Sequence, residues 1–480
     1  MSGYGIEDLV YILPIVFLLV WALVLVLVEA FTKRPDVTML LAAFGLLAAV
    51  TLSVIQFGTE ATAFKEMLTV DGYAVFVYML VLASGLLSLG LAYDYNRRMG
   101  WARGEYYILM LFSIAGAMLM ASAANLIVVF LALELLSIPL YVMAAFVPND
   151  ASSEEAGLKY FLLGAFAGGF VLYGVALIYG ATGATNLMDV VAAALGTNSP
   201  VMLLTGAALI LVGLGFKVAL VPFHMWTPDV YQGAPTPVTA YMAVVAKAGG
   251  FAALFRVFIA AFPSVSADLT PVIATLVVLT LVVGNVAALA QKNIKRMLAY
   301  SSISHAGFLM MAFVTYGSAL YADAVTSLLF YLLAFTVTSF GSWAVVIALE
   351  KAEGKGLDFE DYAGLGKKYP MLSAAMLVFL LSFAGVPPTL GFAGKFFLFR
   401  TVLEAGYAWL AIVGVIMSLV SAFYYLRVVR FMYFEQGDPE VRSEPVLNLV
   451  TAITVVGTIF LFLFSGPLLA WASEAVLALI

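Results

Sequence analysis

The stretch VMLLTGAALILVGLGFKVALVP, residues 201–222, contains the pattern that decides the fold. It is long enough to cross a bilayer, because a spanning helix needs about 20 mainly apolar residues. Lys217 interrupts it, and Pro222 follows five residues later. Proline cannot donate the helical hydrogen bond back to residue 218, so we predict a broken helix beside a lysine at membrane depth. The alternative is a proline kink used for packing, with Lys217 extended towards the surface.

Similar apolar runs continue on both sides of this stretch. With 64% hydrophobic and 10% charged residues, the chain departs from soluble proteins, in which about half of the residues are apolar and about 25% are charged. This composition excludes a soluble enzyme and a disordered chain. Because the runs are continuous and do not alternate, we predict an all-α polytopic membrane protein with about 14 transmembrane helices. The runs are 8–30, 37–57, 72–93, 105–121, 124–147, 157–180, 200–222, 236–262, 270–291, 295–316, 322–349, 370–400, 405–430 and 445–472.

The residue inventory restricts the chemistry of the chain. It has no cysteine, which excludes disulfides, thiolate metal sites and Cys-ligated iron–sulfur clusters, and its two histidines, His224 and His305, make a His-rich metal site or a bis-His haem unfavourable. The sequence has no dense cluster of Lys and Arg of the kind that binds nucleic acid. We therefore expect no cofactor, metal or nucleic acid in this chain, and any redox centre must belong to a partner.

Basic residues predict the orientation of the spans. Sixteen Lys and Arg residues fall in one set of loops, and only Lys65 and Arg400 fall in the opposite set. Since basic loops stay on the cytoplasmic side, we expect both termini to face outward. The start MSGYGIED is acidic and precedes a run long enough to span, so we expect a retained helix and not a cleaved signal peptide.

Ionisable residues inside the runs are the candidate site, because each costs roughly 2.5–3.5 kcal/mol or more to insert. Glu134 is about 13 Å along its helix from Asn125. Lys247 and His305 each lie about ten residues into a helix, and Lys395 follows a second predicted break at Pro387 and Pro388. Together with Lys217, these groups suit a proton relay, because neighbouring charges and burial adjust when each binds or releases its proton. The structural alternatives are a buried ion-pair partner for Glu134 and a satisfied core histidine for His305.

Other charged residues give weaker signals. Arg256 is expected near the outer interface, where it is equally well explained as an anchor. His224, just past Pro222, is structural or lies on a proton uptake route. Lys159 is four residues after Glu155 and is a weak candidate, since the pair also fits a surface contact. The charged loop 350–369 fits either a partner contact or a solvated loop.

The two predicted breaks suggest an internal repeat. The broken helices are spans 7 and 12, and they run in opposite directions. Spans 4–8 and 9–13 are therefore expected to form two inverted five-helix units, an arrangement that transporters use around central broken helices. The corresponding divisions are 1–104, an N-terminal three-helix segment; 105–262 and 270–434, two half-channel units; and 445–480, a C-terminal helix.

Several motifs resemble the antiporter-like membrane subunits of respiratory complex I, NADH–quinone oxidoreductase. The central one is GLGFKVALVPFHMWTPDVYQGAPTPVTAYMAVVAKAGGFAALFR at 213–256, which is more similar to the subunit N family than to subunits L or M. Subunit M has an acid where this chain has Lys395. The other matches touch nearly every span: EYYILMLFS at 105–113, EEAGLKYFLLGAF at 154–166, NIKRMLAYSSISHAGF at 293–308, DYAGLGKKYP at 361–370 and AGVPPTLGFAGKF at 384–396.

The resemblance implies a role for each candidate residue. Glu134 and Lys217 would form the charge pair of the first half-channel, and Lys247 would connect the halves. His305 would bridge them, and Lys395 would lie towards the outer exit. It also implies a bacterial inner (plasma) membrane, other membrane-arm subunits as partners, and flavin, iron–sulfur clusters and quinone held by those partners.

Three other functions remain open from the sequence. The first is a cation/proton antiporter subunit, and the second is a proton pump linked to ferredoxin, F420 or a hydrogenase. The third, a purely structural scaffold, is disfavoured because it gains nothing from the insertion cost of Glu134, Lys217, Lys247 and Lys395.

Overall fold

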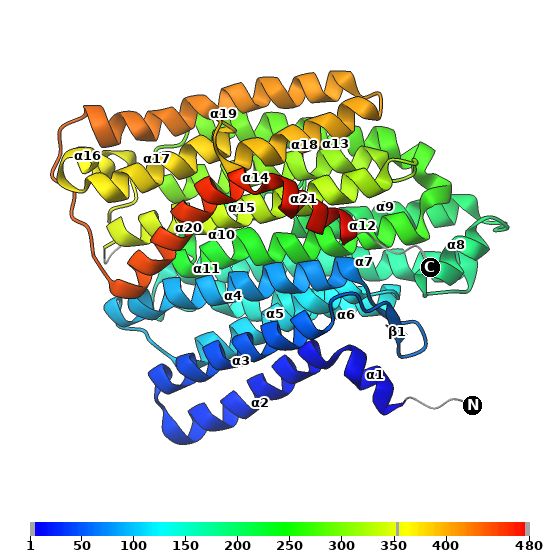
Figure 1. The fold of residues 1–480 in the computed structure, drawn as a ribbon. Helices are drawn as coiled ribbons and strands as arrows, with labels where there is room; N and C mark the ends of the chain where they lie inside the picture. The colour runs from blue at the N-terminus through cyan, green and yellow to red at the C-terminus, as the bar shows by residue number, and fades with distance from the viewer. Residues whose placement is uncertain (1–4, 352–354, 476–480) are drawn as a thin grey trace.

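Long helices dominate the computed structural model, which describes residues 5–351 and 355–475 (Figure 1). Thirteen helices in the described part are long and apolar enough to cross a membrane, which confirms the predicted all-α polytopic class. Ten of them are single α-helices: α2 Leu13–Thr32, α3 Pro35–Ile55, α4 Gly72–Arg98, α5 Gly104–Ser122, α6 Leu126–Ala144, α7 Ala151–Thr182, α9 Pro200–Lys217, α15 Tyr321–Leu349, α19 Ala408–Phe434 and α20 Pro445–Leu463. The other three are composite: α11 Thr236–Tyr241 with η1 Met242–Ala246 and α12 Lys247–Ala261; η2 Pro263–Val265 with α13 Ser266–Leu289; and α14 Ile294–Met311 with η3 Ala312–Thr315.

The expected span 370–400 is divided into two shorter helices. They are α17, Pro370–Ala384, and α18, Leu390–Glu404, with 15 residues each. Gly385 ends α17 with φ +83°, a left-handed conformation that glycine adopts without strain, and two prolines follow. The first predicted break is also present: α9 ends at Lys217, and α10, Trp226–Gly233, begins after an irregular segment. Both breaks therefore occur where proline predicted them.

Short elements cap the two ends of the bundle. A hairpin of β1 (Ala61–Ala63) and β2 (Leu68–Val70) pairs antiparallel with Ala61 opposite Val70, and the apolar runs gave no signal for it. The remaining short helices are α1 Ile6–Tyr11, α8 Leu187–Ala194, η5 Phe359–Tyr362, α16 Leu365–Lys368 and α21 Ser465–Glu474.

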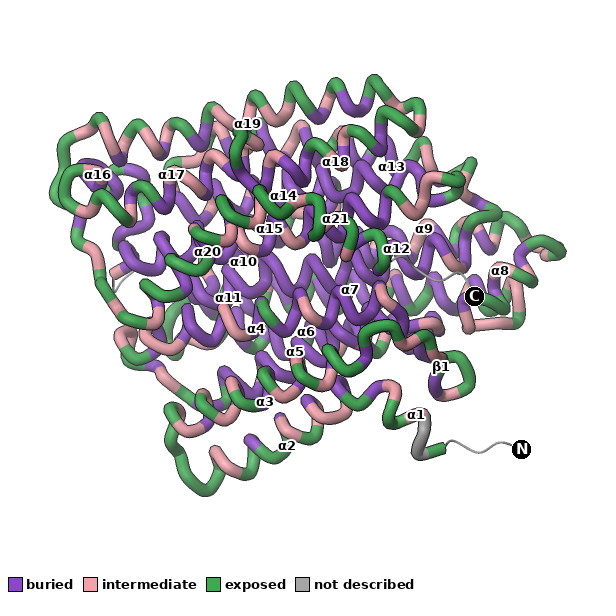
Figure 2. The backbone as a smooth tube through the Cα atoms, viewed as in Figure 1, coloured by how far each residue is buried: buried purple, intermediate pink, exposed green. Residues whose placement is uncertain are grey.

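The most deeply buried helices form the centre of the bundle (Figure 2). The α11–η1–α12 span is fully buried, and α14 and α15 are nearly so, whereas α2, α3 and α20 expose most of their apolar side chains. Exposed leucines and phenylalanines on the outer helices are suited to lipid contact. Charges on the central helices are therefore kept away from lipid by protein on every side.

The packing partners repeat along the chain. Helix α5 packs on α6, and α7 packs on α9 and α10; later, α13 packs on α14, and α15 packs on α17 and α18. The two broken helices thus occupy equivalent places in two successive groups of helices. This pairing agrees with the expected inverted repeat.

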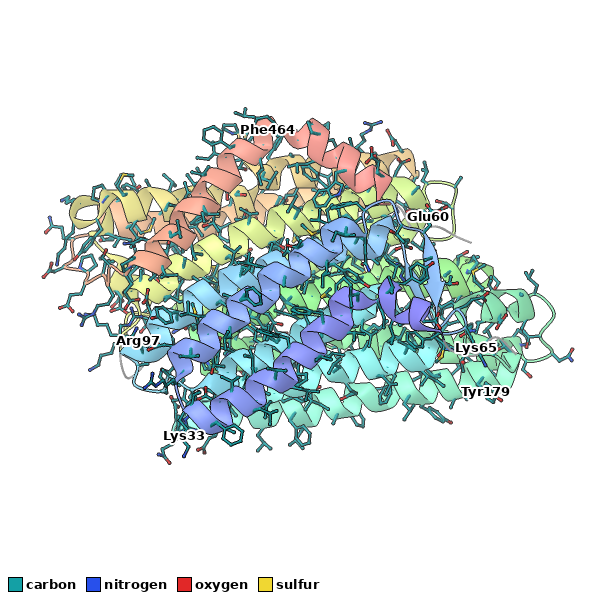
Figure 3. The ribbon with its side chains drawn as sticks, turned by 60° about the horizontal axis from the view of Figure 1, so that its bottom comes forward. Lys33, Glu60, Lys65, Arg97, Tyr179 and Phe464 are labelled. Carbon is teal, nitrogen blue, oxygen red and sulfur yellow. The ribbon has the colours of Figure 1, made fainter. Side chains whose placement is uncertain are left out.

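Loop charges distinguish the two ends of the bundle. Lys33 and Arg97 lie at one end, and Glu60 and Lys65 lie at the other (Figure 3). We call the first the basic end, because the alternation of the spans brings the loops with sixteen Lys and Arg residues to it. Helices α1 and α21 lie near β1, towards the opposite end (Figure 1).

Close packing of α5 on α6 positions the helix that carries Glu134. A Cβ added at Gly116 would lie 2.3 Å from the backbone nitrogen of Leu136, which cannot move without shifting α6. We expect Gly116→Ala to destabilise the subunit by about 1–3 kcal/mol through overpacking. Thermal unfolding of the purified assembly measures the change. Gly169→Ala is the matched control, since nothing lies within 4 Å of its added Cβ; equal stability of the two variants contradicts the packing argument.

Candidate functional site

Lys217 lies at the end of α9 with only 2% of its surface exposed. Its Nζ donates to Ser137 Oγ on α6 at 2.8 Å and to Tyr160 Oη on α7 at 3.0 Å. The ammonium also lies 5.2 Å from the Tyr160 ring centre, within range of a cation–π contact. Its bonded partners are hydroxyl groups, which can accept from an ammonium or donate to a neutral amine.

The break after Lys217 is held in a fixed shape. Ala219 has φ +64°, and the backbone N–H of Val221 donates to Thr280 Oγ1 on α13 at 3.0 Å. Trp226 donates its indole N–H to the Phe216 carbonyl at 3.0 Å and stacks on Tyr160 with ring centres 4.4 Å apart. The unwound segment therefore satisfies its polar groups within the protein and fixes the side chain that contacts Lys217.

Glu134 lies on α6 with its side chain half-buried. A Cβ added at Gly168 would lie 2.6 Å from its Oε1, so the carboxyl group packs on the glycine face of α7. No ion pair within 4 Å joins Glu134 to Lys217 in the described structure, although the two charges are close enough to interact through space. Ser137, one helical turn after Glu134, contacts Lys217 instead.

Lys247 begins α12 directly after the π-helical segment η1. It is 2% exposed, and its Nζ donates to both the backbone carbonyl and the Oγ of Ser302 on α14. A π-helical turn is rare and is often found at functional positions. A Cβ added at Gly250, one turn later, would lie 3.4 Å from Lys217 Cγ, so this glycine lets the two lysine-bearing elements approach closely.

His305 is buried on α14 between two tyrosine hydroxyls. Its Nδ1 lies 2.7 Å from Tyr331 Oη, and its Nε2 lies 3.2 Å from Tyr425 Oη. Tyr425 also shares a hydrogen bond with Ser301. Both ring nitrogens thus face groups that donate or accept, which is the arrangement that a proton relay through imidazole requires.

Lys395 lies on α18, just after the second break. Its Nζ donates to the Phe383 carbonyl at 2.9 Å, to the Ala384 carbonyl at 3.3 Å and to Ser418 Oγ at 3.0 Å. It also lies 4.4 Å from the ring centre of Phe308, three residues after His305. The carbonyls that α17 leaves unpaired at its end are thus the acceptors for this lysine.

Helix α14 brings three of the five predicted residues together. Ser302 contacts Lys247, His305 lies one turn later, and Phe308, a further turn on, contacts Lys395. Lys217 approaches this row through Gly250, and Glu134 lies at its far edge beside Ser137. Lys217, Lys247, His305 and Lys395 therefore form one buried row, each beside at least one hydroxyl group, and half-buried Glu134 lies at its edge.

Known proteins identify the family of this chain. A family model described as "NADH:quinone oxidoreductase/Mrp antiporter, TM" matches residues 123–421. The NADH-quinone oxidoreductase subunit N of Trichlorobacter lovleyi is 44% identical over 474 residues, covering 97% of this chain and 96% of that protein. The chain belongs to the subunit N family of NADH–quinone oxidoreductase. The subunit N of Chloroflexus aggregans is 42% identical and covers 98% of both chains. A chain of respiratory complex I from Thermus thermophilus with bound aureothin is 37% identical, with TM-score 0.82, over 96% of this chain and 99% of that chain.

Arg256 is not a membrane-surface anchor in this member of the subunit N family. It is 3% exposed and forms a bidentate pair with Asp71, with Nη1–Oδ2 at 3.0 Å and Nη2–Oδ1 at 2.7 Å. Its Nε donates to the Ala121 carbonyl at 2.6 Å. The anchor interpretation is wrong because the guanidinium forms a buried ion pair with Asp71, a residue 185 positions away in the chain.

The remaining candidates lie near the basic end. Lys159 contacts Glu155 at 2.7 Å as expected, and it also pairs with Asp229 at 2.7 Å, which Arg296 contacts too. Although burial opposes its charge, these hydrogen bonds from Lys159 and Arg296 hold the pKa of Asp229 below its usual range. His224 is half-buried between α9 and α10. In the loop 350–369, whose residues 352–354 lie outside the described structure, Lys368 pairs with Asp438 at 2.5 Å.

The hydroxyl partners of four of the five residues, Lys217, Lys247, His305 and Lys395, were not predicted from the sequence. They are Ser137, Tyr160, Ser302, Tyr331, Tyr425 and Ser418. Their signal is weak, because serine and tyrosine are common in membrane helices and only contacts between distant helices distinguish these six. Within residues 5–351 and 355–475, no three His, Asp or Glu side chains lie close enough together to bind a metal ion.

Proposed function

We propose that this chain is a proton-translocating membrane-arm subunit of a respiratory NADH–quinone oxidoreductase. The observation that carries the proposal is the buried row of Lys217, Lys247, His305 and Lys395, with half-buried Glu134 at its edge, in a chain of the subunit N family. Ionisable groups inside a membrane protein are costly and normally mark an ion or proton path. In this chain five ionisable groups lie inside the bundle despite this cost, and α14 and its neighbouring helices hold them in a row.

The contacts of the lysines favour proton transfer over a structural role. Each ammonium is bound by hydroxyl or carbonyl oxygens, so it can lose its proton without leaving a buried carboxylate unpaired. By contrast, Arg256 in its bidentate pair with Asp71 keeps a fixed charge, as a structural ion pair does. The row and the ion pair thus differ in their chemistry although both are buried.

The proposed roles follow the order of the row. Ionised Glu134 lies at the edge of the row and, through its negative charge, favours the protonated form of Lys217. Lys247 connects the two units, His305 passes the proton between Tyr331 and Tyr425, and Lys395 releases it. In this proposal residues 105–262 and 270–434 are the two half-channels, and 1–104 and 445–480 flank them.

Electron transfer belongs to partner subunits in this proposal. Other membrane-arm subunits flank the chain, and flavin, iron–sulfur clusters and quinone are bound elsewhere in the assembly. The chain lies in the bacterial inner membrane with its basic end towards the cytoplasm and both termini outward, since basic loops favour that side.

Purification from native membranes in mild detergent tests the assignment to a complex. Mass spectrometry together with visible and EPR spectra of the preparation should reveal other membrane-arm subunits, flavin and iron–sulfur signals. A ferredoxin-, F420- or hydrogenase-type partner would replace NADH as the donor. A colourless preparation with only antiporter-like companions would contradict the proposal and favour cation/proton exchange.

A further inference from the structure

A polar crevice of about 530 Å³ opens at the basic end of the bundle. It lies where α4, the α10–α11 turn, the start of α14 and the end of α15 meet. None of the five residues of the proposed proton path lines it. Its lining includes Tyr95, Trp101, Ser152, Lys295 and Glu350. Two of these, Lys295 and Glu350, are buried ionisable groups with no role assigned so far.

Glu350 is an unusual acid for a loop next to a membrane helix. It is 5% exposed, and its Oε2 has no hydrogen-bond partner among the described residues. The nearby Arg98 pairs with Glu444 at 3.0 Å and donates to the backbone carbonyls of residues 347 and 350, but not to the Glu350 carboxylate. A buried carboxylate without a paired charge is expensive, so stability alone does not account for Glu350.

Lys295 places a second charge in the same crevice. It is 2% exposed, and its Nζ donates to the Ala234 carbonyl at 2.7 Å, while it interacts through space with Glu350 and Asp150. The neighbouring cluster of Lys159, Asp229 and Arg296 is different, because its charges are paired directly. Lys295 and Glu350, in contrast, line the crevice without a direct ion pair to any described residue.

Polar groups continue from the crevice to the centre. The Tyr95 hydroxyl lies beside both Glu350 and Thr236, and Thr236 begins the span that carries Lys247. Farther in, the Tyr231 hydroxyl lies near Ser302, whose oxygens bind Lys247. The hydroxyls of Thr236 and Tyr231 have no hydrogen-bond partner in the described structure, so both are open to a bridging water. Lys295 and Ser302 are seven residues apart on α14, so they share a face about 10 Å apart along the helix.

We propose that this crevice is a proton uptake port and that Glu350 is its acceptor. The inference rests on the proposed function and adds the route by which the row is loaded. The Glu350 carboxylate binds a proton from water at the basic end. The carboxyl group then gives the proton, through bridging water and the hydroxyls of Tyr95, Thr236, Tyr231 and Ser302, to the neutral amine of Lys247, and Glu350 returns to its ionised form.

Glu350→Gln tests the acceptor in the assembled complex. Inverted membrane vesicles expose the basic end, and the readout is the number of protons taken up per NADH oxidised. We expect this ratio to fall to the value of a Lys247→Ala variant measured in parallel, and Glu350→Asp to restore it. Glu360→Gln, an exposed acid of the same loop outside the crevice, should match the parent.

Blocking the crevice gives a second test that does not depend on replacing Glu350. The chain has no cysteine, so Ser152→Cys provides a single thiol at the crevice mouth. A bulky maleimide attached there should lower proton uptake per NADH, whereas the same reagent on Ser443→Cys, exposed at the same end outside the crevice, should not.

The outcomes separate the two proposals. If Lys247→Ala lowers the ratio but neither Glu350→Gln nor labelled Ser152→Cys does, the port is wrong and the proposed function stands. If Lys247→Ala also leaves the ratio unchanged, the proposed function fails. If Glu350→Gln prevents assembly, the labelled Ser152→Cys variant decides alone.

Discussion

Replacing Lys217 with alanine is expected to slow NADH-driven proton translocation by at least about tenfold while the complex still assembles. A positioned acid–base group typically contributes about 10²–10⁴-fold to a proton-transfer step, and no other ammonium can reach Ser137 and Tyr160 from α9. Assembly should survive because the break is held independently by Trp226 and Thr280. Quenching of a pH-sensitive dye in inverted vesicles measures the rate, and immunoblots of the purified complex measure assembly.

Two further variants make this result specific to the site. Lys33→Ala removes an ammonium from an exposed loop and should translocate at the parent rate. Tyr160→Phe keeps the ring that stacks on Trp226 but removes one acceptor of Lys217, so its loss should be smaller. Normal translocation by Lys217→Ala in an assembled complex rules Lys217 out as a relay residue.

Loss of the buried ion pair should have the largest effect on stability. Asp71→Asn leaves the Arg256 guanidinium without its counter-charge in a dry site, and breaking such pairs costs about 3–5 kcal/mol. Asp71 also accepts from the Ala74 N–H at 2.8 Å and so caps α4; asparagine keeps an oxygen for this cap, so the loss reports on the ion pair. Thermal denaturation of the purified complex, followed by release of this subunit, is the measurement.

The double variant Asp71→Asn with Arg256→Met is the control for charge. It removes both charges, so it should recover part of the stability lost by Asp71→Asn alone. Equal stability of Asp71→Asn and the parent would show that the pair contributes nothing. Equal stability of the single and double variants would show that the unpaired guanidinium is not the cause of the loss.

The sequence predicted the spans and both breaks because these features depend on local chemistry. Apolar length sets a spanning helix, and proline removes a backbone donor wherever it falls. Because the prolines locate the breaks, the sequence alone placed Lys217 and Lys395 beside them. The 370–400 run differed only in being two 15-residue helices, since Gly385 and the prolines stop α17 midway.

Features that depend on distant contacts could not be predicted in the same way. Arg256 has the local pattern of an anchor, and only the fold brings Asp71 to it. The π-helical turn before Lys247 has no marker in MAVVA, residues 242–246. The binding of the Lys217 ammonium by the hydroxyls of Ser137 and Tyr160, and not by the Glu134 carboxylate, likewise depends on contacts between helices.

The central claim is that protons pass through the buried row, and Lys247 lies on its fully buried span. The direct measurement is the number of protons translocated per NADH in proteoliposomes containing the purified complex with Lys247→Ala. We expect a lower ratio than in the parent complex, because Ser302 and the groups beyond it on α14 then lose their connection to Lys217. An unchanged ratio in a fully assembled Lys247→Ala complex would contradict the account.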